Sequence, residues 1–193
     1  QPPPVLPREG VVTFYGPDRT LVTGETENAV VITGGVAVEY LDYTNSRSLH
    51  LSAESAVVFL DPGSVADLLR AGPGEVRGVY LEGDVVATDG DYTLRGPRLY
   101  YDIATNNGLM LDAVFWSYPD RVGMPLYVRA EEIRQHSESQ WSAKEARIAN
   151  TAFFDPQFSI GATSVTLSRD ASLDTPGDFA VDARNVTYRI GDL

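Results

Sequence analysis

The side chains that most often carry out chemistry in proteins are sparse in this sequence of 193 residues. It contains no cysteine and only two histidines, His50 and His136, which lie far apart in the chain and are explained most simply as surface residues of strands. It has no Gly-x-Ser-x-Gly nucleophile motif, phosphate-binding loop, His-Glu-x-x-His motif or dinucleotide-binding fingerprint. We therefore predict no catalytic residues, no metal site and no cofactor.

Among the side chains that commonly act as acids, bases or metal ligands, only the carboxylates are abundant, with 27 Asp and Glu in total. Asp84, Asp89 and Asp91 cluster around a predicted turn, where a calcium site is one interpretation and a solvated hairpin tip is the simpler one. No pattern singles out two carboxylates as a glycosidase pair. We expect a protein that is not an enzyme.

The overall charge and the distribution of apolar residues narrow the classes of partner. The formal net charge is −12 and no basic patch is visible, which argues against binding to nucleic acid or to anionic lipid headgroups. No segment approaches the roughly 18 consecutive apolar residues of a membrane-spanning helix. Residues 1–10 are rich in proline and are predicted to form a tail, whereas residues 11–193 are predicted to form a single domain.

A pattern of apolar and small residues recurs six times along the chain. In its clearest copy the residues are Leu94, Gly96, Leu99 and Tyr101, separated by steps of two, three and two. Residues two apart share one face of a strand, but a step of three turns the second half to the other face unless a bulge or sharp bend intervenes. The pattern therefore predicts strands interrupted at mid-length around an apolar interior, with a small residue leaving room at the corner. The other copies start at Leu51, Val128, Trp141, Ile160 and Val181.

The residues between and within the copies also have the character of strands and turns. The two residues that separate the halves of a copy are mostly polar, as in Lys144-Glu145 and Arg184-Asn185, which is typical of an exposed bulge. Turn residues separate the copies, and Thr105-Asn106-Asn107-Gly108 is predicted to be a hairpin turn in which Asn107 and Gly108 are suited to positive φ. Short strands at close, regular spacing predict an all-β fold with antiparallel pairing. One short helix is predicted near residues 64–71.

The apolar positions of these strands are candidates for lining a groove that holds an apolar ligand. Burial of an acyl chain contributes about 0.8 kcal/mol per methylene, so even partial enclosure would support binding. Packing of the same side chains in a filled core explains each position at least as well. The ten candidates are Val38, Leu51, Leu94, Tyr101, Phe115, Val128, Trp141, Ile148, Ile160 and Leu167.

A series of motifs in the centre of the chain gives a more specific indication. It consists of a glycine-led strand, a Gly-Asp-Tyr-x-Leu strand, a Tyr-Asp strand end and a Leu-Asp-Ala strand. The residues are Gly83-Asp84-Val85-Val86, Gly90-Asp91-Tyr92-Thr93-Leu94, Arg98, Tyr100-Tyr101-Asp102, Gly108 and Leu111-Asp112-Ala113. In order and spacing this series resembles the OstA-like family, the periplasmic lipopolysaccharide-transport domain. The likeness is clearest over residues 79–155 and extends over residues 30–190.

The resemblance implies a fold and a function together. The fold would be a single antiparallel, strongly bent β-jelly roll, or β-taco. Its groove would shield the acyl chains of lipopolysaccharide, or of a similar glycolipid, during transport across the periplasm to the outer membrane of a Gram-negative cell. Such domains stack through sheet edges with like jelly-roll subunits. The C-terminal barrel and cysteines of the outer-membrane translocon are missing, as is the anchor of the inner-membrane partner, so we expect a bridge protein or an excised domain.

Two other functions are compatible with the sequence. One is an interaction or assembly scaffold with a filled core, either a curved sandwich or a parallel β-helix, whose turns would suit the 19- and 21-residue intervals late in the chain. The other is a carbohydrate-binding module, an enzyme or a lectin, in which Trp116, Trp141 and the tyrosines stack on sugars. Arg95 and Arg98 flank the central strand, and surface salt bridges are their simplest use.

Overall fold

The computed structural model describes residues 11–23, 28–42, 47–60, 76–88, 90–102, 107–118, 123–137, 140–153, 156–169 and 179–190. All fourteen strands of this part of the chain belong to one antiparallel sheet, which confirms the all-β prediction. The described residues contain no helix, and therefore none that could cross a membrane. The predicted tail 1–10 and the helix predicted near residues 64–71 lie outside the described residues.

The strands are short at the two ends of the sheet and long in its centre. They are β1 (Val11–Tyr15), β2 (Asp18–Thr23), β3 (Asn28–Thr33), β4 (Val36–Asp42), β5 (Arg47–Ala53), β6 (Ser55–Leu60), β7 (Val76–Thr88), β8 (Tyr92–Asp102), β9 (Asn107–Ser117), β10 (Leu126–Ser137), β11 (Gln140–Ala149), β12 (Phe158–Arg169), β13 (Phe179–Arg184) and β14 (Thr187–Ile190).

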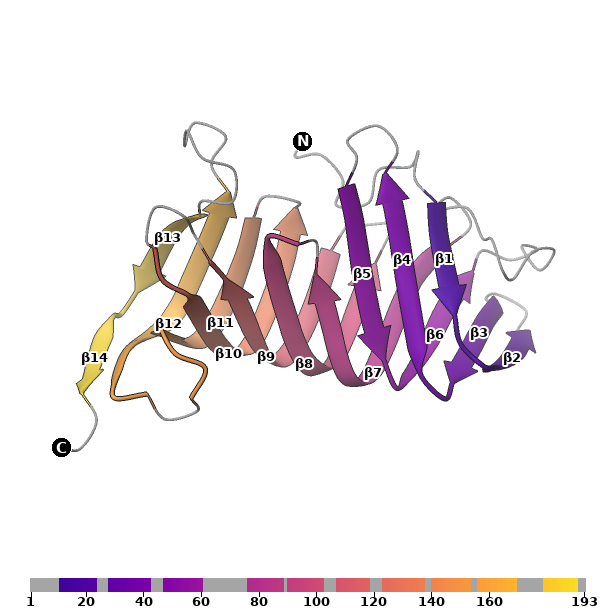
Figure 1. Ribbon diagram of the computed structural model, residues 1–193, viewed down its shortest axis with the longest axis horizontal. Helices are drawn as coiled ribbons and strands as arrows, with labels where there is room; N and C mark the ends of the chain where they lie inside the picture. The colour runs from indigo at the N-terminus through magenta and orange to yellow at the C-terminus, as the bar shows by residue number, and fades with distance from the viewer. Residues whose placement is uncertain are drawn as a thin grey trace.

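The sheet divides into two branches at each end. Residues 76–82 of β7 pair with β6, whereas residues 86–88 of the same strand pair with β5. At the other end, residues 158–161 of β12 pair with β14 and residues 164–169 pair with β13. Figure 1 shows β1, β4 and β5 in front of β6, with the long strands running from one layer into the other along the lower edge. Because every pairing is antiparallel, the alternative of a parallel β-helix is wrong.

The step of three within the repeat has the predicted structural effect. In β8, Leu94 and Leu99 are both buried although they are five positions apart, and in β11 Ala143 and Ala146 are both buried although they are three positions apart. From β7 to β11, every second strand contains a residue with a left-handed backbone conformation at its interruption. Apart from glycines, the described residues with positive φ are Asp84 in β7, Asp112 in β9, Glu145 in β11 and Asn185 between β13 and β14. Glu145 and Asn185 belong to the polar pairs that the sequence marks as bulges, so both halves of each strand can face the same core.

Gly96 occupies the corner position of its repeat copy, where the neighbouring strand leaves no space for a side chain. A Cβ atom at this residue would lie 2.9 Å from both Cγ and Sδ of Met110 on the neighbouring strand, and 3.0 Å from the carbonyl oxygen of Leu111. We expect Gly96→Val to lower the free energy of unfolding by about 1–3 kcal/mol, because two added methyl groups overpack this site. Urea denaturation checks the value, and a Gly96→Val protein as stable as wild type would contradict the lack of space at this corner.

The hairpin turn predicted at residues 105–108 is wrong at Asn107 and Gly108, because both belong to β9, whereas Thr105 and Asn106 lie outside the described residues. Asn107 pairs with Asp102 and Gly108 pairs with Tyr101, and neither has positive φ. A Cβ at Gly108 would lie 3.3 Å from the side chains of Tyr101 and Gln135. The absence of a side chain at Gly108 therefore lets the side chains of the two neighbouring strands pack closely against β9.

Glu132 in β10 anchors a small ionic cluster on the surface of the sheet. Its Oε1 atom lies 2.7 Å from Nε of Arg134 and 2.9 Å from Nζ of Lys144 on β11. Hydrogen bonds from Arg134 and then Lys144 lower the pKa of Glu132 from 4.5 to about 2. Since the pKa is lower in the folded chain, the cluster stabilises the fold above pH 4.5 and loses this contribution as the pH falls towards 2.

We therefore expect wild-type protein to lose more stability than Glu132→Gln between pH 4.5 and pH 2. The measurement is the urea midpoint of both proteins at several pH values, since the other carboxylates titrate equally in the two. Parallel curves over this range would show that the cluster contributes nothing to folding.

Candidate functional site

Seven of the ten predicted groove residues lie in one continuous row that crosses the sheet. Each member of the row is paired directly with the next on the adjacent strand, so their side chains share the inner face. We call this set row 1. It consists of Phe14, Val38, Leu51, Ala87, Leu94, Phe115, Val128, Ile148, Ile160 and Tyr188.

The other three predicted residues, Tyr101, Trp141 and Leu167, lie in a second row formed by the other halves of the long strands. We call it row 2. It consists of Val30, Val58, Val79, Tyr101, Gly108, Gln135, Trp141, Leu167 and Val181. Gln135 occupies the last position of the repeat copy that starts at Val128, where the other copies have an apolar residue, and it places a polar residue in this otherwise apolar row. The structure thus brings the ten predicted residues together on one face, in two rows.

The two rows meet in the middle of the molecule through three aromatic rings. The ring of Trp141 in row 2 lies 6.3 Å from that of Phe115 in row 1, measured between centroids. Tyr92 contacts both rings, at 5.5 Å from Phe115 and 5.4 Å from Trp141. Phe115 and Trp141 are almost completely buried. Here the interior is filled by packed side chains, so a ligand can enter between these rings only by displacing them.

Burial decreases along both rows towards the C-terminal strands. In row 1, Val128 is fully buried, Ile148 and Ile160 are partly exposed, and Tyr188 on β14 is 72% exposed. In row 2, Leu167 is buried but its neighbour Val181 on β13 is 45% exposed. Val181 and Tyr188 belong to the sixth repeat copy, whose inner face is therefore open, unlike that of the copies in β8 and β11.

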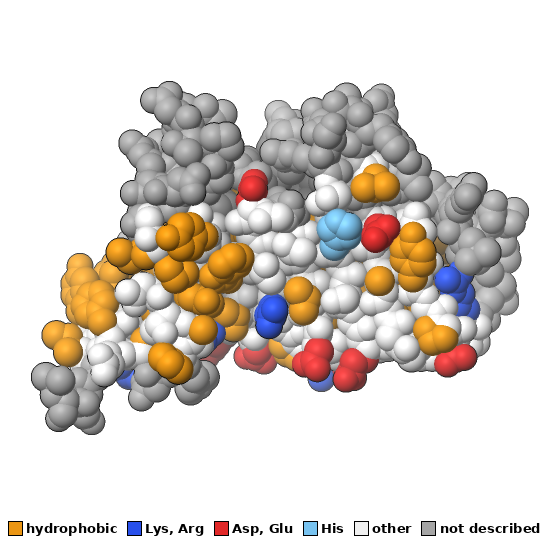
Figure 2. Space-filling view, in the orientation of Figure 1, with side chains coloured by type: hydrophobic (Ala, Val, Ile, Leu, Met, Phe, Trp, Pro, Cys, Tyr) orange, Lys and Arg blue, Asp and Glu red, His pale blue; other side chains and the backbone are white. Residues whose placement is uncertain are grey.

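Other apolar side chains extend this uncovered surface. Phe158 and Ile190 pair with each other across β12 and β14 and are also exposed. Figure 2 shows hydrophobic side chains gathered at the end of the molecule that these strands form. We call this surface the open end, and define it as Phe158, Ile160, Val181, Val186, Tyr188 and Ile190.

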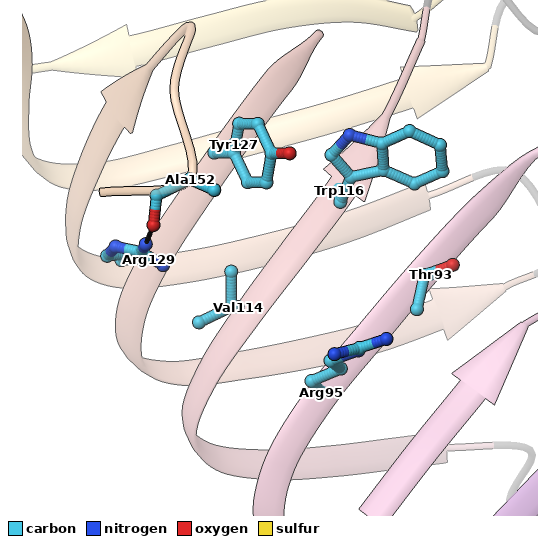
Figure 3. A pocket seen from close by; sticks show the side chains of 7 residues that line it. All are labelled: Thr93, Arg95, Val114, Trp116, Tyr127, Arg129 and Ala152. Atoms are coloured by element: carbon cyan, nitrogen blue, oxygen red, sulfur yellow. Dashed lines mark hydrogen bonds between the residues drawn. The ribbon is translucent and has the colours of Figure 1, made fainter. Parts of the chain in front are cut away.

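A separate pocket lies on the outer face of β8, β9 and β10. Its volume is about 480 Å³. Trp116 is paired with Thr93 on one side and Tyr127 on the other, and Figure 3 shows these side chains around the cavity. Nη2 of Arg129 donates a hydrogen bond to the carbonyl oxygen of Ala152, which forms one wall. The pocket residues are Thr93, Arg95, Val114, Trp116, Tyr127, Arg129 and Ala152.

The two tryptophans therefore have different roles. Trp116 lines the outer pocket, where a ligand can reach it, whereas Trp141 is 1% exposed and is wrong as a sugar-stacking platform. The alternation of buried and exposed residues along β9 explains this difference. Trp116 lies between the buried residues Phe115 and Ser117 and must therefore face outward. Tyr127 is one of the tyrosines predicted as sugar platforms, whereas Arg129 is not predicted from the sequence, because its contact with Ala152 depends on the loop after β11.

The remaining polar candidates lie on the surface. His50 is exposed on β5, with Nδ1 3.7 Å from Oε1 of Glu39, and His136 is exposed on β10, with Nε2 2.7 Å from Oγ of Ser142. Arg98 forms the expected surface ion pair, at 3.4 Å from Glu82. Among the described residues, no three acidic or histidine side chains are grouped so that they could hold a metal ion, and Asp89 lies outside that part of the chain.

Comparison with known proteins adds no identification to this geometry. A scan against protein-family models gave no match, and a search of curated proteins found no similar sequence.

Proposed function

We propose that the protein is a non-catalytic lipid-carrying module that shields the acyl chains of lipopolysaccharide, or of a similar glycolipid, during passage across the periplasm to the outer membrane. The observation that carries the proposal is the open end, where two apolar rows on the inner face of the sheet become exposed. The resemblance of residues 79–155 to the OstA-like family supports it. In this proposal the sheet bends like a taco, and the acyl chains lie where the taco is open, at the C-terminal strands.

The position of the acyl chain follows from the burial of the rows. An acyl chain would lie along Tyr188 and Ile160 and extend inward as far as Ile148, the last partly exposed residue of row 1 before the fully buried Val128. It would stop at the contact between Phe115 and Trp141, where the interior is filled. Each methylene removed from water contributes about 0.8 kcal/mol, so a chain covering the open end binds without deep insertion.

The same end of the sheet suits stacking with a like domain. In the part of the chain that is described, β13 and β14 each pair on one side only, with β12. An edge strand offers unpaired backbone groups to a strand of another domain. Addition of a second jelly roll at this edge would continue rows 1 and 2 beyond Tyr188 and Val181, and would extend the apolar path from one domain to the next.

Calorimetric titration with lipopolysaccharide tests the proposal, and its acyl-free saccharide portion serves as the control ligand. We expect tighter binding of lipopolysaccharide than of the acyl-free saccharide, and weaker binding of lipopolysaccharide by Tyr188→Glu, which places a charge at the open end. Tyr118→Glu is the matched control, because Tyr118 is an exposed tyrosine on another part of the surface. If the acyl-free saccharide bound as well as lipopolysaccharide, the proposal would be refuted.

A scaffold with a filled core is the second candidate function. It is favoured by the burial of seven of the predicted groove residues, which pack in the interior without any ligand. These residues are Val38, Leu94, Tyr101, Phe115, Val128, Trp141 and Leu167. Absence of lipid binding by a folded protein, together with association through β13 and β14, would support this function instead.

A further inference from the structure

We infer that the pocket on the outer face of β8, β9 and β10 binds a saccharide unit that carries a carboxylate or a phosphate group. The pocket lies on the face of the sheet opposite to rows 1 and 2, since Thr93 and Arg95 alternate with the buried Leu94. The inference therefore does not depend on the lipid-carrying proposal. Its volume of about 480 Å³ is within the roughly 300–1,000 Å³ of small-molecule sites.

Two arginines frame the floor of the pocket. Arg95 on β8 and Arg129 on β10 are both paired with Val114 on β9, so the register places them in one row with Val114 between them. Their backbones are separated by two strand spacings, about 10 Å. Figure 3 shows both guanidinium groups on the side of the sheet that bears Trp116. An anionic group above Val114 would be within reach of both side chains, and arginine binds carboxylate and phosphate through paired N–H donors.

The interactions that each arginine makes within the protein are compatible with binding an anionic ligand. Arg129 is held in place by its hydrogen bond to the carbonyl oxygen of Ala152. Arg95 is exposed, and no acidic side chain among the described residues forms an ion pair with it. By contrast, Arg98 on the same strand is paired with Glu82. In a chain with a net charge of −12, two arginines gathered without a carboxylate partner form a local site for an anion.

The aromatic side chains determine the rest of the ligand. Trp116 and Tyr127 are neighbours across β9 and β10, next to the row that contains the arginines. Both are partly exposed, and they present flat apolar surface beside polar groups. The C–H face of a pyranose ring fits such a surface, while its hydroxyl groups can reach Thr93 and the backbone of Ala152. A free inorganic anion would leave the aromatic surface unused.

Tryptophan indole signals in a nitrogen-15 NMR spectrum provide a direct test. The chain has only two tryptophans, one in the pocket and one in the core, so the spectrum reports both sites at once. Trp116→Phe assigns the two signals. The probes are digalacturonic acid for the carboxylate, glucose 6-phosphate for the phosphate, and maltose and inorganic phosphate as controls. We expect at least one acidic sugar to shift the Trp116 signal and to leave the Trp141 signal in place.

Variants of the two arginines on β8 locate the binding. Arg95→Gln should weaken the binding of the acidic sugar by about 10- to 100-fold, the loss of one charge-assisted contact. Arg98→Gln removes the same charge from the same strand outside the pocket, and should change the affinity less than about 2-fold. A response to only one of the two acidic sugars would identify the anionic group.

Three results would overturn the inference. The first is the absence of any shift of the Trp116 signal with both acidic sugars. The second is an equal response to maltose or to inorganic phosphate, which would show that the sugar and the anion are not recognised together. The third is an equal loss of affinity in Arg95→Gln and Arg98→Gln, which would reflect general attraction of anions to the surface.

Discussion

Replacement of Trp141 by alanine is expected to lower the free energy of unfolding by about 3–5 kcal/mol. Trp141 is 1% exposed and joins the two rows of the interior through its contacts with Phe115 and Tyr92. Its removal leaves a cavity at the point where the two layers meet, and it also removes two aromatic contacts. Equilibrium unfolding in urea, followed by far-ultraviolet circular dichroism, measures the loss.

Trp116→Ala is the matched control for this substitution. It removes the same side chain from the outer pocket, where Trp116 is already partly exposed, and should cost less than about 1 kcal/mol. Similar losses in the two variants would contradict the assignment of Trp141 to a filled interior and of Trp116 to an accessible site.

Leu94→Glu is expected to prevent folding at neutral pH. Leu94 is 6% exposed in the middle of row 1, between Ala87 and Phe115, with no cationic side chain in the row. A carboxylate at this position would be buried without a partner, which costs several kcal/mol in addition to the lost leucine packing. A domain with a stability of only about 5–15 kcal/mol does not tolerate this loss. Circular dichroism and size-exclusion chromatography detect the failure to fold.

Tyr188→Glu introduces the same charge at the exposed end of the same row and should leave the fold intact, because Tyr188 is 72% exposed. The pair of variants therefore separates the filled middle of row 1 from its open end. A folded Leu94→Glu protein with wild-type stability would mean that water reaches the interior at Leu94, and that the apolar groove extends through the middle of the molecule.

The sequence allowed the strand pattern to be predicted, because the pattern is local. The step of three from Gly96 to Leu99 indicates an interruption of the strand, and the polar pairs that contain Glu145 and Asn185 mark two positions of left-handed backbone. The same alternation places the predicted groove residues on one face. Asn107-Gly108 was misinterpreted, because the dipeptide favours a turn by its chemistry but here begins a strand beside Tyr101.

The openness of each part of the interior could not be predicted, because it depends on which strands cover one another. Leu167 and Val181 are adjacent in row 2 and both apolar, yet the first is buried and the second is 45% exposed. The sequence indicates the outer pocket only through its aromatic residues, Trp116 and Tyr127. Arg129 becomes part of it because β10 aligns this residue with Val114 and because the loop after β11 brings Ala152 alongside.

The most direct test of the lipid-carrying proposal is site-resolved photocrosslinking to lipopolysaccharide. A photoreactive phenylalanine derivative is placed in turn at Ile160 and Tyr188 in the open end, and at Glu131, an exposed polar position on β10, as control. The proposal predicts adducts at Ile160 and Tyr188, none at Glu131, and none when the acyl chains have been removed. Absence of adducts at both apolar positions in folded protein, or equal labelling at Glu131, would contradict it.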